Sequence, residues 1–196
     1  MATDSALTRE QILSATEGVL RRFGPTKATV VDVARTLGVS HGSVYRFFSS
    51  KAALREAVTE RWLAQAHDEL RFIAIEPGPA AERLHRWLAT LFAAKRKKAL
   101  DDPQLFATYT TLVGETSSIV DAHLDALTDQ IAQIIQDGIE KGEFRHTPIA
   151  STARAVFEAT AHFHHPAHAS GWSDPAAGDR FETLWKLVLR GLAADT

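Results

Sequence analysis

The segment from Thr29 to Lys51 constrains the fold of this chain most, because it predicts two short helices joined by a tight turn. Thr29 fits an N-cap position, and Asp32 can return the hydrogen bond of a capping box. Apolar residues then recur at helical spacing, and Gly38 fits the left-handed position that ends a helix. Ser40 can cap a second helix. The side chains expected to face inward are Val30, Val33, Ala34, Leu37, Val44, Phe47 and Phe48.

The second of these helices keeps small and hydrogen-bonding side chains on its outer face. In a helix-turn-helix, the N-terminal end of the second helix enters the major groove of DNA. The same geometry with glycine at the corner also occurs in all-α proteins that do not bind DNA, so the pattern alone leaves both interpretations open. The outward residues are His41, Gly42, Ser43, Tyr45 and Arg46.

Charge is distributed unevenly along the 196 residues. Residues 20–61 contain eight basic and three acidic side chains, a local charge of +5, which leaves −7 for the remaining residues of a chain whose net charge is −2. Contacts to DNA phosphates need local cations rather than a basic protein, so a basic DNA-binding head on an acidic body fits this distribution. A run of solvent-exposed charges without any role in DNA binding would give the same local charge.

The residues themselves indicate a family. Across residues 8–60, the order T-(x)3-V-A-(x)2-L-G-V-S-(x)2-S-(x)-Y-R-F-F-(x)2-K, followed by ALREAV, resembles the N-terminal domain of the tetracycline-repressor-like (TetR) regulators. The resemblance implies a helix-turn-helix DNA-binding domain at residues 1–52 and a ligand-binding and dimerisation domain at residues 53–196. The matching residues are Thr29, Ala34, Gly38, Val39, Tyr45, Phe48, Lys51 and Leu54.

The resemblance also implies which residues contact double-stranded DNA. Phosphates are contacted at the positions of Thr29, Ser40, Tyr45 and Lys51. Bases are read at the positions of His41, Gly42, Ser43 and Arg46, with Val31 near the groove. Arg46 and His41 can donate to guanine O6 and N7, although a neutral His41 can instead contact only phosphate. The Tyr45 ring can also pack within the head.

The rest of the chain predicts helix after helix, because no alternating apolar run of strand length stands out. We therefore expect an all-α fold of about nine helices. Besides the helix-turn-helix, the expected helices span Thr8 to Gly24, Lys51 to about Ile75, Ala80 to Lys98, Asp101 to about Glu115, Ile119 to Lys141, Thr147 to Thr160 and Asp179 to Ala193. Basic residues at 95–98 suit the C-terminal end of a helix dipole.

The last two helices carry apolar residues on more than one side, which is typical of helices buried on more than one side. The final helix has Leu187, Leu189 and Leu192 outside its inward stripe, and the penultimate one has Ala155, Ala159 and Phe163. The resemblance implies that these helices form a four-helix interface in a homodimer, which would match a palindromic operator. Burial within this one chain is the alternative.

Regulators of this kind usually bind a small, often apolar or aromatic effector inside the body, which releases the DNA. Aromatic and polar residues of the body are candidates for such a pocket, although each also suits an ordinary core. The candidates for ligand binding are Trp87, Phe106, Tyr109, Phe157, His162 and Phe163.

Four histidines between residues 162 and 168 raise a sharper alternative, a metal-responsive regulator. His162, His165 and His168 would share one face of a helix, and imidazole suits zinc, nickel or copper. Against this, Pro166 should end or kink the helix, and no carboxylate lies between Ala159 and Ser173. We therefore expect neither a metal nor another cofactor.

Composition and missing motifs exclude several other classes. There is no cysteine, no stretch of 18 apolar residues and no export signal in MATDSALTRE, so we expect a cytoplasmic protein that does not bind membranes. No enzyme motif is visible, so we expect no catalysis. A sequence-nonspecific DNA-binding protein would be basic throughout, unlike the −7 body. The expected function is transcription regulation, most simply repression relieved by an effector.

Overall fold

The computed structural model describes residues 7–64, 67–114 and 117–194, which form ten α-helices and two short 3₁₀ helices without a β-strand. The all-α expectation is confirmed. Three expectations lie outside these ranges: the export-signal assignment at residues 1–6, the continuity of a helix through residues 65 and 66, and the helix end at Glu115. Within the described residues, no helix is both long and apolar enough to cross a bilayer.

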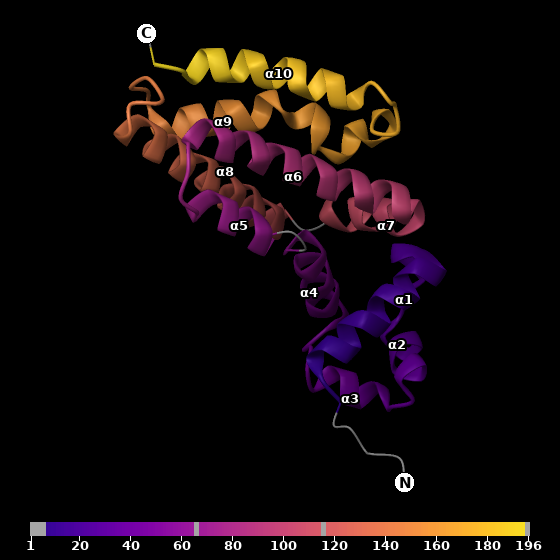
Figure 1. Cartoon of the computed structure of the whole chain (residues 1–196). Helices are drawn as coiled ribbons and strands as arrows, with labels where there is room; N and C mark the ends of the chain where they lie inside the picture. Colours follow the sequence, from indigo (N-terminus) through magenta and orange to yellow (C-terminus); the bar gives the residue numbers. More distant parts are fainter. Residues whose placement is uncertain (1–6, 65–66, 115–116, 195–196) are drawn as a thin grey trace. The chain divides into compact units, whose positions relative to one another are not determined.

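The helices form two compact units, and the first contains the helix-turn-helix. It consists of residues 1–63 and 102–120, and its described helices are α1 (Arg9–Lys27), α2 (Val30–Leu37), α3 (His41–Tyr45), α4 (Lys51–Ala64) and α7 (Pro103–Gly114). Figure 1 shows α1, α2 and α3 gathered together, with α4 leading away from them. Gly24 interrupts α1 with a positive φ of 73°. The core of this unit includes Ile12, Leu20, Val33, Val44, Phe48, Leu54 and Trp62.

Helix α7 joins this unit through α1 and α4, although it lies far away in the sequence. The ring of Tyr109 stacks on Trp62 at 4.6 Å, and its hydroxyl donates to Glu17 Oε1 at 3.0 Å. Burial, followed by the charge of Glu17, raises the Tyr109 pKa well above its usual value. Arg61 binds the same carboxylate group at 2.7 Å. This grouping reflects packing, and the functional boundary after residue 52 stays a prediction.

Two aromatic side chains of this unit lie outside its core, although helical spacing predicts that both Phe23, in the helix that begins at Thr8, and Phe47 face inward. Phe23 is 41% exposed and Phe47 is 40% exposed. Gly24 breaks the helix directly after Phe23. Helix α3 ends at Tyr45, so Phe47 lies outside the helix and the helical spacing does not apply to it. Leu37 is only partly buried, whereas Val30, Val33, Ala34, Val44 and Phe48 are buried as expected.

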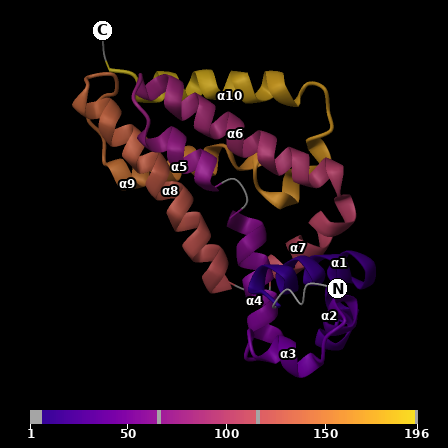
Figure 2. The ribbon, with the colours of Figure 1, turned by 60° about the horizontal axis from the view of Figure 1, so that its bottom comes forward.

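The second unit, residues 64–101 and 121–196, is a layered helical bundle. Its described helices are α5 (His67–Ile75), α6 (Ala80–Asp101), α8 (Ser117–Glu140, in this unit from Asp121), α9 (Ile149–Ala159), η1 (Ala161–Phe163), η2 (Pro166–Gly171) and α10 (Ala177–Leu192). Figures 1 and 2 both show α10 running beside α6, where His85 pairs with Glu182 at 2.9 Å. The core includes Leu70, Leu84, Trp87, Leu91, Ile131, Ile135, Phe157, Trp172 and Phe181.

Buried polar contacts cross-link α5, α6 and α8 in this bundle. Arg83 is 1% exposed, and its guanidinium donates to the Ala74 carbonyl and to Asp137 Oδ2, each at 2.9 Å. The indole N–H of Trp87 donates to Gln130 Oε1 at 2.9 Å. A buried arginine needs such partners because an uncompensated charge is costly in a core.

Helix α9 ends at Ala159, within one residue of the expected Thr160, and short 3₁₀ turns follow it. The hydroxyl of Thr160 donates to the carbonyls of Val156 and Phe157, and His164 Nε2 lies 3.0 Å from the Phe157 oxygen. The Val156 carbonyl also accepts the backbone N–H of Thr160 at 3.2 Å, so these side chains add contacts to the last turn of the helix. Phe163 lies in the 3₁₀ turn that follows and is 4% exposed, and the prediction that it occupies an outer helical face was wrong.

The basic run at residues 95–98 does not end its helix, because α6 continues to Asp101. Lys97 pairs with Asp101, and Arg96 Nε donates to the carbonyl of Trp172 at 2.7 Å. Lys95 is partly buried. The run therefore serves contacts within the second unit, in addition to any interaction with the helix dipole.

Candidate nucleic-acid interface

The helix-turn-helix is shaped by side-chain caps close to one another in sequence. Thr29 and Asp32 form a complete capping box at the start of α2, as the sequence predicts. The N–H of Gly38, whose φ of 67° is left-handed, reaches back to the carbonyls of Ala34 and Arg35. Ser40 caps α3 by accepting the Ser43 N–H at 3.2 Å. Each cap satisfies backbone groups that a helix end leaves unpaired, so local sequence fixes the turn.

Helix α3 buries one side chain and presents the rest. Val44 is 1% exposed and anchors the helix, whereas Tyr45 is 43% exposed and stands edge-on to the ring of His41 at 6.3 Å. His41, Gly42 and Arg46 are exposed, and Ser43 is partly exposed. A face of this kind can donate and accept hydrogen bonds along a DNA groove.

The remaining predicted DNA contacts lie beside this face within the first unit. Val31 is 53% exposed on α2, Lys51 is exposed at the start of α4, and Thr29 and Ser40 are exposed at the two N-caps. The hydroxyl of Thr29 donates to Asp32 Oδ2 at 2.5 Å, so its cap competes with any phosphate contact. The roles of all nine residues stay predictions.

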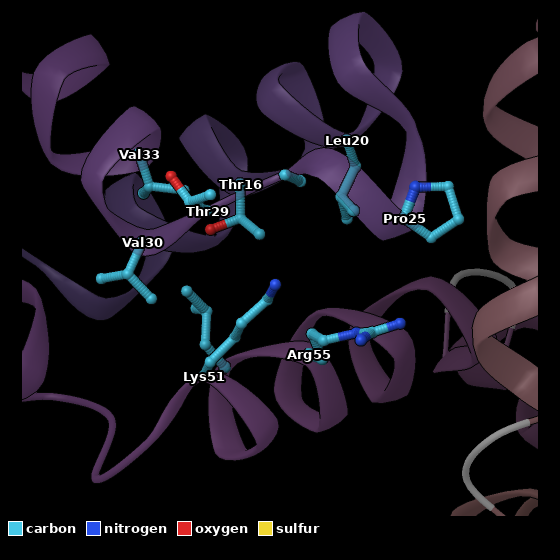
Figure 3. Close-up of a pocket in the computed structure, with 10 residues that line it drawn as sticks. Thr16, Leu20, Pro25, Thr29, Val30, Val33, Lys51 and Arg55 are labelled. Atoms are coloured by element: carbon cyan, nitrogen blue, oxygen red, sulfur yellow. The ribbon is translucent and has the colours of Figure 1, made fainter.

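A small hollow lies between α1, α2 and α4, with room for about one water molecule (about 20 Å³). Leu20, Val30, Val33 and Leu54 contribute apolar walls. Figure 3 shows Lys51 reaching from α4 toward Thr16 and Thr29, whereas Arg55 extends toward the Pro25 side of the hollow. The hollow was not predicted from the sequence, because residues from three helices form it.

A further basic residue near the predicted interface was missed by the sequence analysis. The guanidinium of Arg9 lies over the ring of Phe48, 5.0 Å from its centre. Phe48 follows α3 and is 4% exposed, so Arg9 lies near the end of α3. Only its place at the start of the first helix could have signalled this.

Two family models match the chain on either side of residue 60. Residues 12–58 match the bacterial regulatory proteins of the tetR family, and residues 80–185 match the tetracyclin repressor-like C-terminal domain. The second match alone covers more than half of the chain. The chain belongs to the TetR family.

Individual TetR relatives match different lengths of the chain. The transcriptional regulator TtgR of Pseudomonas putida is 36% identical over 63 residues, which cover 32% of this chain and 30% of that protein. The chain therefore spans less than a third of this relative. The structure of FadR from Bacillus subtilis with stearoyl-CoA is 16% identical, with 94% of this chain and 99% of that chain covered and a TM-score of 0.66. The structure of a putative transcriptional regulator from Pseudomonas aeruginosa PAO1 is 18% identical, with 97% of this chain and 94% of that chain covered and a TM-score of 0.74. At these identities, the likeness shows the fold alone.

The six predicted effector-binding residues of this TetR protein do not share one packing unit. Phe106 and Tyr109 belong to the first unit, where both rings contact Trp62. Trp87, Phe157, His162 and Phe163 belong to the second. Phe163 packs against Phe92 and Phe181, and Phe157 stacks on His164 at 4.3 Å. Their role in ligand binding stays a prediction.

The histidine cluster does not form the helical face proposed for a metal. His162 lies in η1, His165 caps η2 and His168 lies within η2, with ring centres of His162 and His168 4.9 Å apart. Among residues 7–64, 67–114 and 117–194, no group of three histidine or acidic side chains is placed to hold a metal ion. The structure thus offers no support for a metal-responsive member of the TetR family.

Proposed function

We propose that this TetR protein is a homodimeric, ligand-responsive transcriptional repressor that binds a palindromic operator. The observation that carries the proposal is the exposed face of α3, held by the Ser40 cap and the Val44 anchor next to a capped α2. Membership of the TetR family supports the same conclusion.

The base contacts are assigned to His41, Gly42, Ser43 and Arg46, and the phosphate contacts to Thr29, Ser40, Tyr45 and Lys51. Arg46 has the geometry to donate two hydrogen bonds to one guanine, whereas Lys51 acts as a point charge. Val31 supplies an apolar contact beside the groove.

Dimerisation is assigned to α10 with α9. Leu187 on α10 is 60% exposed, and Ala155 and Ala159 are exposed on α9, where small side chains permit close approach. A two-fold dimer would present two copies of α3 about one DNA turn apart.

The effector is assigned to the second unit. The structural neighbour FadR is described in complex with stearoyl-CoA, which is consistent with a small-molecule effector for a protein of this fold. Effector binding would then favour a state of the dimer that no longer fits the operator.

The test compares Arg46→Ala with Lys51→Ala in anisotropy titrations of labelled operator DNA and of random DNA. Arg46→Ala should cost about 1–3 kcal/mol on the operator only, because it removes a base contact, and Lys51→Ala should weaken both DNAs and reduce the salt slope by about 1. Equal losses for Arg46→Ala on both DNAs would reassign Arg46 to phosphate.

Gly42→Ala separates folding from recognition at the same helix. A Cβ at this position would lie 3.7 Å from Ser40 Oγ, an ordinary contact, so the melting temperature should not fall. Changed operator affinity at unchanged stability would support Gly42 as a groove contact, and unchanged affinity would remove it from the interface.

A protein that binds random DNA as tightly as any genomic fragment would instead be a nonspecific DNA-binding protein.

A further inference from the structure

The guanidinium of Arg9 covers a buried ring at the end of the helix-turn-helix. It lies 5.0 Å from the centre of the Phe48 ring, which is 4% exposed, whereas Arg9 itself is exposed. Phe48 is tied to α3, because its N–H donates to the Val44 carbonyl at 3.2 Å. Arg9 begins α1, yet its charged group therefore lies at the surface beside the last turn of α3.

This position is close to two of the predicted DNA contacts. Phe48 lies three positions after Tyr45 and three before Lys51, and the proposed function assigns both to DNA phosphates. Three residues of chain span at most about 11 Å, so a cation over the Phe48 ring is near both of them. Because Arg9 comes from α1, it does so from outside the helix-turn-helix.

Arg9 also differs from other arginines of the first unit in its partners. Glu10, the next residue, pairs with Arg61 rather than with Arg9. In the part of the chain that the structure describes, no carboxylate pairs with Arg9, and its contact is the Phe48 ring. Other arginines of this unit are held by carboxylates: Arg21 by Asp102, Arg35 by Asp32 and Arg61 by Glu17.

A ring contact of this kind prepares an arginine to bind a phosphate. The ring holds the side chain in place, while the guanidinium keeps N–H donors that can bind two oxygens of one phosphate. Because the side chain is already held, binding costs less conformational entropy than ordering a free arginine would.

The opposite end of the same helix repeats this arrangement. The guanidinium of Arg22, which is also exposed, lies 5.1 Å from the centre of the Phe23 ring. Arg22 follows Arg9 by thirteen positions, which is about 20 Å along an α-helix. The two arginines thus match in charge, exposure and ring contact, but only Arg9 lies beside α3.

We propose that Arg9 binds a phosphate of the operator backbone, next to the phosphates assigned to Tyr45 and Lys51. A phosphate contact carries no base preference, so Arg9 adds affinity for every DNA rather than selectivity. This inference rests on the proposed function, and it extends the DNA interface from the helix-turn-helix to the start of α1.

The experiment compares Arg9→Met with Arg22→Met in anisotropy titrations at several salt concentrations. The DNAs are random DNA and the genomic fragment that the wild type binds most tightly. Arg9→Met should weaken both about tenfold, because it removes a charge-assisted contact, and should reduce the salt slope by about 1 for each protomer bound. The matched control Arg22→Met loses the same charge and a similar ring contact, and should bind both DNAs as the wild type does.

Arg9→Lys tests whether the charge or the structure matters. It keeps the charge without the planar fork, so the salt slope should stay that of the wild type while the affinity falls about threefold. Thermal unfolding of each variant measures any damage to the fold, which should be slight because a ring contact at an exposed site is weak. A purely structural role of Arg9 would leave the salt slope unchanged in Arg9→Met as well.

Uncharged phosphates locate the contact itself. On a specifically bound fragment, one phosphate at a time is replaced by a neutral methylphosphonate. At one phosphate in each half-site, the replacement should weaken the wild type about tenfold and leave Arg9→Met unchanged, because its partner is already missing. The proposal is overturned if no phosphate of such a fragment behaves in this way, or if Arg9→Met and Arg22→Met bind alike.

The outcomes also separate this inference from the proposed function. Specific binding of one fragment, with Arg9→Met and Arg22→Met alike, would leave the regulator standing and refute the Arg9 contact. Equal binding of all fragments, with Arg9→Met weaker than Arg22→Met, would refute the sequence-specific regulator alone. A wild type that binds no DNA would overturn both.

Discussion

Different kinds of hydrogen bond stabilise the helix-turn-helix and the second unit, although the first unit also has the long-range contact between Tyr109 and Glu17. In the helix-turn-helix of the first unit, the decisive hydrogen bonds join residues three to five positions apart, as in the Thr29–Asp32 box and the Gly38 cap. In the second unit they join helices far apart in sequence: Arg83 with Asp137, Trp87 with Gln130 and Arg96 with Trp172. In the helix-turn-helix, neighbouring residues therefore determine the local structure. In the second unit, the packing of the helices depends on residues far apart in the sequence.

If this comparison is correct, removing one long-range contact from the second unit costs more than removing one cap from the first. Arg83→Ala should lower the free energy of unfolding by about 3 kcal/mol, because it removes a buried side chain and leaves the Ala74 carbonyl and the partly exposed Asp137 without their partner. Denaturant titration measures the loss. The control Arg154→Ala removes an exposed pair with Glu158 and should cost less than about 0.5 kcal/mol. Equal costs would contradict the comparison.

The pH dependence of stability should also distinguish the units. The folded-state pKa of His164 is lowered to about 4, so the unfolded chain binds its proton more readily. Its burial is therefore without cost above about pH 6.5 and becomes destabilising as the pH falls towards 4, by up to about 3 kcal/mol. In the first unit, the lowered pKa values of Asp32 and Asp102 delay the corresponding loss until the pH falls below about 4.

Denaturant titrations between pH 7 and 4 measure this effect, with His164→Phe beside the wild type. The variant should lose less stability across that range, and the exposed control His146→Gln should follow the wild type. Identical pH profiles for wild type and His164→Phe would show that His164 is not the group responsible.

A glycine in the second unit gives a prediction about close packing. A Cβ on Gly138 of α8 would overlap the Phe144 ring and lie 2.9 Å from the Ala80 Cβ. Gly138→Ala should therefore cost about 1–3 kcal/mol, because the neighbours must move. Gly18→Ala on α1 meets nothing within 4 Å and should stabilise by about 0.5–1 kcal/mol through helix propensity. Thermal unfolding of both variants measures the difference, and stabilisation by both would show that the Phe144 contact yields easily.

The loss of a cap in the first unit should cost less than the loss of Arg83 in the second. Thr29→Ala removes one acceptor and one donor at the start of α2 and should cost about 1 kcal/mol. Thr29→Ser keeps the hydroxyl and should cost less. A loss for Thr29→Ala as large as that for Arg83→Ala, measured in the same denaturant, would remove the distinction between the units.

The same distinction explains what the sequence could predict. Caps leave local signals, so Thr8, Thr29, Gly38 and Ser40 located three helix starts and one helix end correctly. The hydrogen bond from Tyr109 to Glu17 spans 92 positions and leaves no such signal. For that reason Tyr109 was predicted to lie in the body, whereas it packs in the first unit.

The candidate sites show the same limit. The exposed face of α3 follows from one buried residue, Val44, in a five-residue helix. By contrast, Phe163 is buried in a 3₁₀ turn beyond α9, where Thr160 and His164 contact the carbonyls of the last helical turn, and no helical periodicity reveals these contacts. Phe23 and Phe47 were misplaced because periodicity assumes that a helix continues past the glycine or the turn.

Sequence-specific DNA binding is the central claim, and anisotropy of labelled DNA from upstream of this protein's own gene tests it most directly. With competitor DNA at physiological salt, we expect saturable binding and a slope of log affinity against log salt of about −6 to −10. A footprint on the same DNA should show two protected half-sites. If the upstream DNA is not bound specifically, a pool of genomic fragments is titrated under the same conditions. Binding no tighter than to random DNA across that pool would contradict the proposed function.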